Sequence, residues 1–230
     1  MLNQMTLAVR LRDDATFTNF YPGANQQVLS YLKQTIQGQG ERAIFLWGKE
    51  GVGRSHLLQA CCHYAEEQGL SALYLSLQSV QSVAPAMLMG LESYALICID
   101  DIDGIAGQPN WEEALFHFYN RLHERGSRLV VSATHPPLEI SLSLRDLTSR
   151  LAWGMVFQLH ALTDEDKIAA LQLRAAQRGL RLQQSVARFL LQRCPRSMAQ
   201  LFAALERLDE ASLTAQRHLT IPFVKQILGL

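Results

Sequence analysis

The sequence predicts an α/β fold, in which a five-stranded parallel sheet flanked by helices is followed by a small all-helical C-terminal part. Three observations predict this fold. Short, nearly continuous apolar runs alternate with longer helical patterns before residue 160, which is typical of strands buried on both faces of a parallel sheet. A glycine-rich loop joins the first apolar run to the helix that follows it. After Leu159 only helical patterns continue.

The strands and the helices between them are predicted from the length and the ends of each pattern. Turn-forming residues stop the apolar runs, as Gly48 stops the first and Pro136 follows the fourth. The expected strands span residues 43–47, 72–77, 94–99, 128–134 and 155–159. The expected helices among them span residues 24–37, 55–68, 82–92 and 111–125.

The C-terminal part is predicted to contain four helices. Thr163 is the expected cap of the first helix, because Asp166 stands three positions later, as in a capping box, and Gly179 is its expected end. Pro222 suits the first turn of the last helix. The two helices between them are expected at residues 183–193 and 197–211. The expected division of the chain is an N-terminal segment over 1–15, an α/β domain over 16–161 and a helical domain over 162–230.

Composition excludes several classes of protein. Hydrophobic residues make up 48% and charged residues 18% of the chain, which is typical of a globular protein and excludes a disordered one. The 21 basic and 21 acidic side chains balance, so the total charge favours binding neither to nucleic acid nor to a membrane. The four cysteines include no C-x-x-C pair and predict neither a disulfide framework nor a zinc site. Since we find no leader and no apolar run of membrane-spanning length, we expect a cytoplasmic protein.

The loop after the first strand nearly matches the phosphate-binding pattern G-x-x-x-x-G-K-[ST]; the lysine position alone differs and is Arg54. In such a loop backbone N–H groups surround phosphate oxygens, the next helix presents its N-terminus, and Ser55 would hold Mg²⁺. Arginine is planar and always charged, so it neutralises a diphosphate but follows a transferring phosphate less well than lysine. This favours nucleotide binding over fast hydrolysis. The residues expected to contact nucleotide here are Gly48, Lys49, Glu50, Gly51, Val52, Gly53, Arg54, Ser55 and His56.

Polar residues follow the third and fourth strands. Asp100 and Asp101 come directly after a buried run, an arrangement in which Asp100 reaches Mg²⁺ directly or through water. Asp101 stands where many ATPases carry a glutamate that orients water, and its side chain is shorter. Thr134 at the end of the fourth strand is a candidate phosphate sensor. The alternatives are an exposed acidic loop and an ordinary loop start, and the phosphate loop favours the functional interpretation of the aspartates.

These motifs, in this order, resemble the AAA+ P-loop module, and within it the DnaA/Hda family of replication proteins. The similarity covers residues 16–230. Its segments are Thr16–Asn25, Leu96–Ile102 and Ser149-Arg150-Leu151-Ala152-Trp153-Gly154, which is similar to the arginine-finger box of DnaA. On pattern alone Arg150 would be a surface arginine. The resemblance implies the sheet order 5-1-4-3-2, a nucleotide between the body and a helical lid, and base contacts from Tyr21, Pro22 and Asn25.

Two further features make the chain resemble the regulatory members of this family. No part of it resembles the DNA-reading or N-terminal interaction domain of DnaA. The segment Gln4-Met5-Thr6-Leu7-Ala8-Val9 is similar to the Gln-Leu-x-Leu peptide by which bacterial proteins bind the sliding clamp, with Met5 in place of leucine. The lid departs from DnaA, because Ala199 stands where DnaA-like lids carry a sensor arginine, and Arg196 is the candidate replacement.

The resemblance implies a regulatory function with weak or absent intrinsic ATPase activity. Bound to ADP, the protein would dock on the DNA polymerase sliding clamp, meet ATP-bound DnaA and insert Arg150 in trans as an arginine finger. Hydrolysis would inactivate DnaA and prevent re-initiation of replication. DNA would be met mainly through the loaded clamp, and homo-oligomers are left open. The alternatives are a self-sufficient ATPase of the helicase-loader type and a DNA-binding adaptor that uses the more basic lid.

Overall fold

The computed structural model describes residues 11–12, 14–78, 84–215 and 217–230. The chain divides into two compact units. Of the described residues, those up to Phe17 and those within Asn25–His160 form one unit, and those within Thr18–Ala24 and Ala161–Leu230 form the other. The predicted clamp-binding segment, Gln4–Val9, lies outside the described residues.

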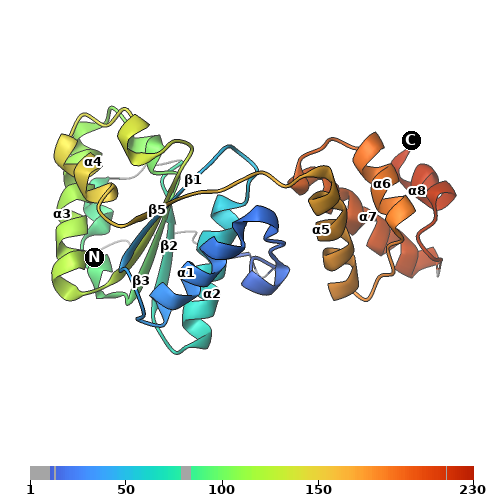
Figure 1. Ribbon diagram of the computed structural model, residues 1–230, viewed down its shortest axis with the longest axis horizontal. Coiled ribbons are helices and arrows are strands. Elements are labelled where there is room, and N and C mark those ends of the chain that lie inside the picture. Colours follow the sequence, from blue (N-terminus) through green and yellow to red (C-terminus); the bar gives the residue numbers. More distant parts are fainter. Residues whose placement is uncertain (1–10, 13, 79–83, 216) are drawn as a thin grey trace, which may run out of the picture. The chain divides into compact units, whose positions relative to one another are not determined.

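The first unit is built on a parallel sheet of five strands in the order β2-β3-β4-β1-β5, which confirms the predicted order (Figure 1). The strands are β1 Ala43–Trp47, β2 Ala72–Ser76, β3 Leu96–Asp100, β4 Arg128–Ala133 and β5 Met155–Gln158. Every residue of β3 is buried, as expected of a central strand covered on both faces. Because the strands are parallel, the loops after β1, β3 and β4 meet at one edge of the sheet.

Helices cover both faces of this sheet, with α1 and α2 on one side and α3 and α4 on the other (Figure 1). They are α1 Gln26–Ile36, α2 Arg54–Glu67, α3 Pro109–Arg125 and α4 Arg145–Leu151. Phe118 of α3 and Leu147 of α4 belong to the same buried cluster as Phe45 and Val131 of the sheet. This cluster attaches α3 and α4 to the strands that carry the candidate site.

The expected helix over residues 82–92 is wrong. The described part of this segment contains two short 3-10 turns, η4 Pro85–Leu88 and η5 Leu91–Ser93. Gly90 separates them with a φ of 85°, a left-handed conformation that interrupts a right-handed helix. Leu88 still packs in the core of the first unit. The apolar pattern therefore indicated buried side chains, but not an α-helix.

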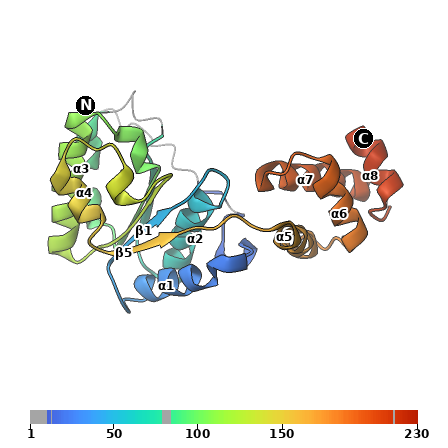
Figure 2. The same cartoon turned by 45° about the horizontal axis from the view of Figure 1, so that its top comes forward.

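The described part of the second unit contains four α-helices, as predicted (Figure 2). They are α5 Asp164–Gln177, α6 Gln184–Arg193, α7 Met198–Ala215 and α8 Ile221–Leu228. The capping box is confirmed, since the Thr163 side chain accepts from the Asp166 N–H and the Asp166 carboxylate accepts from the Thr163 N–H. Leu171, Leu190 and Leu205 form the centre of the unit's own core. Among the described residues, no helix is long and apolar enough to cross a membrane.

Candidate functional site

The loop between β1 and α2 has the backbone that a phosphate-binding loop needs. Gly51 and Gly53 have φ values of 80° and 102°, which side chains rarely tolerate, and Gly53 is the residue before the first turn of α2. A Cβ on Gly48 would lie 2.8 Å from the carbonyl oxygen of Leu159. The glycines therefore let the loop turn tightly, pass close to the chain after β5 and present free N–H groups at a helix N-terminus.

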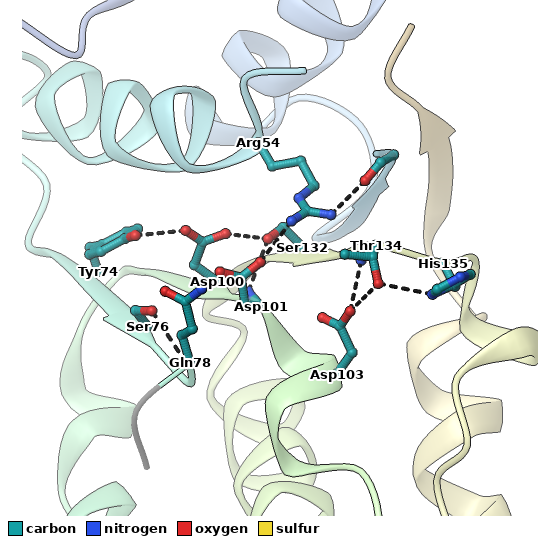
Figure 3. A network of polar contacts seen from close by, with 11 residues as sticks. Arg54, Tyr74, Ser76, Gln78, Asp100, Asp101, Asp103, Ser132, Thr134 and His135 are labelled. Carbon is teal, nitrogen blue, oxygen red and sulfur yellow. Dashed lines mark hydrogen bonds and ion pairs between the residues drawn. The ribbon is translucent and has the colours of Figure 1, made fainter. Parts of the chain in front are cut away.

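Arg54 connects the glycine-rich loop after β1 with the aspartate that follows β3 (Figure 3). Its Nη1 donates to the carbonyl oxygen of Gly48 at 2.5 Å, and its Nη2 donates to Oδ1 of Asp101 at 2.9 Å. The Arg54 side chain is 9% exposed, so this pair is largely removed from water. The residue in the lysine position of the loop thus holds the loop to the carboxylate that follows β3.

Asp101 is placed by an uncommon backbone conformation. Its φ of 54° is positive, and no other described residue apart from glycine has a positive φ. Burial raises the pKa of the Asp101 carboxyl, the neighbouring Asp100 raises it further, and the charge of Arg54 opposes both effects. An aspartate in this position, paired with a buried arginine, is poorly placed to orient an attacking water molecule.

Asp100 is buried at the end of β3 and is only 1% exposed. The hydroxyl of Tyr74 donates to its Oδ2 at 2.7 Å, and the hydroxyl of Ser132 donates to its Oδ1 (Figure 3). Ser132 also accepts from the N–H of Asp101 at 3.1 Å. Burial, and then the charge of Asp100, raise the pKa of Tyr74, so this hydroxyl keeps its proton for the hydrogen bond. Both carboxylate oxygens of Asp100 are therefore engaged within the protein.

Thr134 belongs to a neighbouring polar group at the same edge (Figure 3). Its N–H donates to Oδ2 of Asp103 at 3.1 Å, and its hydroxyl donates to the same oxygen. His135 lies 2.9 Å from the Thr134 hydroxyl through Nδ1. The other oxygen of Asp103 is buried without a hydrogen-bond partner. Asp103 therefore fixes the predicted sensor, a role that the sequence did not indicate.

These carboxylates do not fit a magnesium ion that relies on the protein for its ligands. Both oxygens of Asp100 are engaged, and Arg54 places a positive charge beside Asp101. Within the described residues, no group of three or more His, Cys, Asp or Glu side chains could hold a metal ion. That Asp100 reaches Mg²⁺, directly or through water, stays a prediction, and the burial of this carboxylate works against direct contact.

The remaining residues of the predicted nucleotide site are distributed as follows. Lys49 and Glu50 are exposed in the loop, whereas Ser55 in the first turn of α2 is half-buried. His56 lies within hydrogen-bonding distance of the Thr16 carbonyl oxygen, at 2.9 Å. Val52 is half-buried.

Asn25 is 1% exposed, and its amide bonds both the carbonyl oxygen and the N–H of His160, at 3.0 and 2.8 Å. Asn25 thus anchors the chain after β5, which was not anticipated. Tyr21 and Pro22, the other two predicted base contacts, belong to the second unit.

Arg150 lies in the last turn of α4 and is half-buried. Its Cζ atom is 4.7 Å from the centroid of the Trp153 ring, and this ring stacks on His123 of α3 at 5.9 Å between centroids. Trp153 is 64% exposed. With the described carboxylates Arg150 forms no ion pair, so its guanidinium keeps its hydrogen-bond donors available while an aromatic ring holds it.

Gly154 explains how Trp153 is positioned. A Cβ on Gly154 would lie 2.2 Å from the carbonyl oxygen of Ala43, the first residue of β1. Real Cβ atoms do not approach a backbone oxygen so closely, so only glycine fits here. The close passage over β1 places the turn between α4 and β5, which carries Trp153, against the sheet.

Arg196, the candidate replacement for a lid sensor, lies before the third helix of the second unit. It precedes α7, which begins at Met198, and it is exposed. Its Nη2 pairs with Oδ2 of Asp164 at 3.3 Å, at the start of α5 within the same unit. Ala199 is exposed in the first turn of α7. Arg196 thus lies outside α7 and pairs with an acid of its own unit.

Comparison with known families now identifies the module. Residues 11–158 match the bacterial DnaA ATPase domain. The chain belongs to the bacterial DnaA ATPase family. Residues 164–228 match the lid domain of Hda. A DnaA-type ATPase domain is thus followed by an Hda-type lid, which confirms the predicted membership in the DnaA/Hda family.

Solved structures of DnaA show the same fold. Domain III of the replication initiation protein DnaA from Thermotoga maritima is 22% identical with a TM-score of 0.81, and the match covers 96% of this chain and 98% of that one. DnaA bound to AMPPCP and single-stranded DNA is 21% identical, with a TM-score of 0.74 over 90% of this chain and 69% of that one. AMPPCP-bound DnaA from Aquifex aeolicus is 22% identical, with a TM-score of 0.73 over 85% and 65%. The AAA+ fold with a helical lid is thereby confirmed.

In this DnaA-family module, sequence reasoning missed further contributors to the site besides the role of Asp103. Tyr74 and Ser132 hold Asp100, and His123 stacks on the tryptophan beside Arg150. Ser132 lies within the fourth predicted strand, and the parallel register places it beside the end of β3. That register was the signal that could have found it. His123 carried no such signal, because it lies on a helix, and strand register does not place it beside Trp153.

Proposed function

We propose that the protein is an ADP-bound regulator of DnaA. It docks on the DNA polymerase sliding clamp through Gln4–Val9 and supplies Arg150 to ATP that is bound by DnaA. Hydrolysis leaves DnaA in its ADP form and prevents re-initiation of replication. In this proposal the protein acts in the cytoplasm, reaches DNA mainly through the loaded clamp, and is not a fast ATPase itself.

The surroundings of Arg150 carry this proposal. An arginine finger must be charged, must keep its donors free for phosphate oxygens and must be held in one orientation before the partner arrives. Arg150 meets these needs: it pairs with no carboxylate of the described chain, and it rests on the ring of Trp153 at 4.7 Å. In trans it would stabilise the charge that develops on the transferring phosphoryl group.

The pairing of Arg54 with Asp101 supports the regulatory form of the proposal. A hydrolytic site needs a free acid to orient water, whereas this acid accepts a hydrogen bond from a buried guanidinium at 2.9 Å. The phosphate loop and the N-terminus of α2 are suited to holding a diphosphate. The protein would then keep its own nucleotide while it acts on that of DnaA.

The decisive experiment measures single-turnover loss of ATP from DnaA in the presence of the clamp loaded on DNA. Arg150→Ala should reduce the stimulation by between about a hundredfold and several powers of ten, because a full charge is withdrawn from the transition state. Arg150→Lys should rescue poorly, since the planar fork is lost. The matched control is Arg145→Ala, which removes an exposed arginine from the other end of α4. Near-normal stimulation by Arg150→Ala would overturn the assignment.

A second candidate is direct DNA binding, because one similar DnaA structure is bound to single-stranded DNA. It predicts salt-dependent binding of single-stranded DNA by the purified protein in the absence of the clamp. If the purified protein does not bind single-stranded DNA and stimulates DnaA only in the presence of the loaded clamp, the regulatory function is favoured.

A further inference from the structure

We propose that the protein binds its nucleoside diphosphate without magnesium, with the guanidinium of Arg54 supplying the positive charge that a metal ion supplies elsewhere. The inference rests on the nucleotide binding of the proposed function and concerns the cofactor that this binding requires. It is carried by the hydrogen bonds and the ion pair around Asp100 and Asp101, which leave the acids of the site engaged within the protein.

Asp100 is the acid that would hold the metal or its water shell, and its burial works against both. The carboxylate is 1% exposed and accepts one hydrogen bond on each oxygen, from Tyr74 and from Ser132. Magnesium keeps several water molecules and tolerates little departure from octahedral geometry. Because the carboxylate is buried, a hydrated ion could reach it only if the surrounding side chains moved, and such a movement would disturb its two hydrogen bonds.

Asp101 is engaged by a cation already. Its Oδ1 accepts from Arg54 Nη2 at 2.9 Å, and the two side chains are 19% and 9% exposed. Arg54 thus offsets one of the negative charges that would attract a divalent cation here, and it occupies a carboxylate oxygen that such a cation would use. Ser55, in the first turn of α2, is the remaining candidate ligand on the protein, and one hydroxyl does not compensate for two engaged acids.

Arg54 has the donors to take the place of the metal. A guanidinium carries five N–H groups in a fixed plane. Two of them bond the carbonyl oxygen of Gly48 and the carboxylate of Asp101. Three are left for phosphate oxygens, at the point where the N-terminus of α2 and the backbone of the loop also donate. A diphosphate thus meets a permanent cation that is already fixed in the loop.

The test is calorimetric titration of the full chain with ADP, once in excess magnesium and once in excess EDTA. We expect the two dissociation constants to agree within about threefold, whereas a site that depends on the metal would lose about tenfold or more in EDTA, or about 1.4 kcal/mol. Binding that needs magnesium would overturn this inference and leave the proposed nucleotide binding intact. Absence of binding in both buffers would overturn both.

Arg54→Lys tests the cause. The single ammonium group of lysine cannot replace the fork that bonds Gly48 and Asp101 together, so Asp101 becomes available and magnesium should now strengthen ADP binding by about tenfold. The matched control is Arg12→Lys, which makes the same change in an exposed arginine that pairs with Asp14 at 3.1 Å. It should bind ADP equally in both buffers. An Arg54→Lys variant that folds and stays indifferent to magnesium would contradict the role assigned to Arg54.

Discussion

The guanidinium of Arg150 lies over the indole ring of Trp153, with Cζ 4.7 Å from the ring centroid. Since the ring also stacks on His123 of α3, three residues from α3, α4 and the turn after α4 form one stack at the surface. An arginine held in this way loses less conformational freedom when it engages a partner than a free one would. The packing of α3 and α4 thus holds Arg150, the residue that we propose acts on the ATP bound by DnaA.

Trp153→Leu should weaken the stimulation of DnaA without unfolding the protein. A cation–π contact at an exposed site contributes about 0.5–1 kcal/mol, so the single-turnover rate should fall about two- to fivefold. Trp153→Phe keeps an aromatic face and should recover much of the rate. Because Trp153 is mostly exposed, the melting temperature and the affinity for ADP should change little. Equal rates for the leucine variant and the unaltered protein would show that the ring does not orient Arg150.

Gly154→Ala should destabilise the first unit. The added Cβ would lie 2.2 Å from the Ala43 carbonyl oxygen, so β1 or the turn after α4 must move, at a cost of about 3 kcal/mol or more in the free energy of unfolding. The control is Gly69→Ala, where φ is also unfavourable, at 74°, but no atom lies within 4 Å. That change should cost about 1–2 kcal/mol. The check is the denaturant midpoint of both variants, and a smaller loss for Gly154→Ala than for Gly69→Ala would contradict the steric argument.

Gly53→Asp should abolish ADP binding. Gly53 adopts a φ of 102° directly before α2, and a carboxylate there is strained and repels phosphate. Gly69→Asp makes the same change beyond the other end of α2 and should leave binding unchanged, as measured by calorimetry.

In the unaltered protein, ADP should bind more tightly than ATP. The check is calorimetry, and equal affinity for the two nucleotides would count against an ADP-specific site.

Intrinsic ATP hydrolysis should be slow or absent, because Asp101 accepts from Arg54 at 2.9 Å and is not free to orient water. We expect steady-state turnover well below ~1 s⁻¹, the lower end of the ordinary enzyme range. The measurement uses purified protein without DnaA or clamp. Faster turnover would revive the interpretation as a self-sufficient ATPase of the helicase-loader type.

Replacing Gln4, Met5 and Leu7 together with alanine should remove clamp binding, because an extended peptide of this kind is recognised through alternate side chains. Affinity for ADP should be unchanged, which serves as the internal control. The check is co-elution with the clamp in gel filtration. If the triple variant still co-elutes, another surface makes the contact.

Local patterns in the sequence determined much of the architecture. The apolar runs predicted all five strands, the glycine spacing predicted the phosphate loop before α2, and Thr163 with Asp166 predicted the start of α5. These features depend on residues that are close together along the chain, so their physical causes are visible in a short window of sequence. The helix expected over residues 82–92 failed because the same apolar pattern also fits short turns that bury Leu88.

The state of the site was decided by the tertiary structure. Tyr74 comes from β2 and Ser132 from β4, and it is the parallel register on both sides of β3 that brings their hydroxyls to Asp100. The sequence indicated that Arg54 and Asp101 would share a site, but only the folded chain brings them to 2.9 Å and so engages both charges. Hydrogen bonds and ion pairs act over a few ångströms, and only folding brings residues this distant in the sequence so close together.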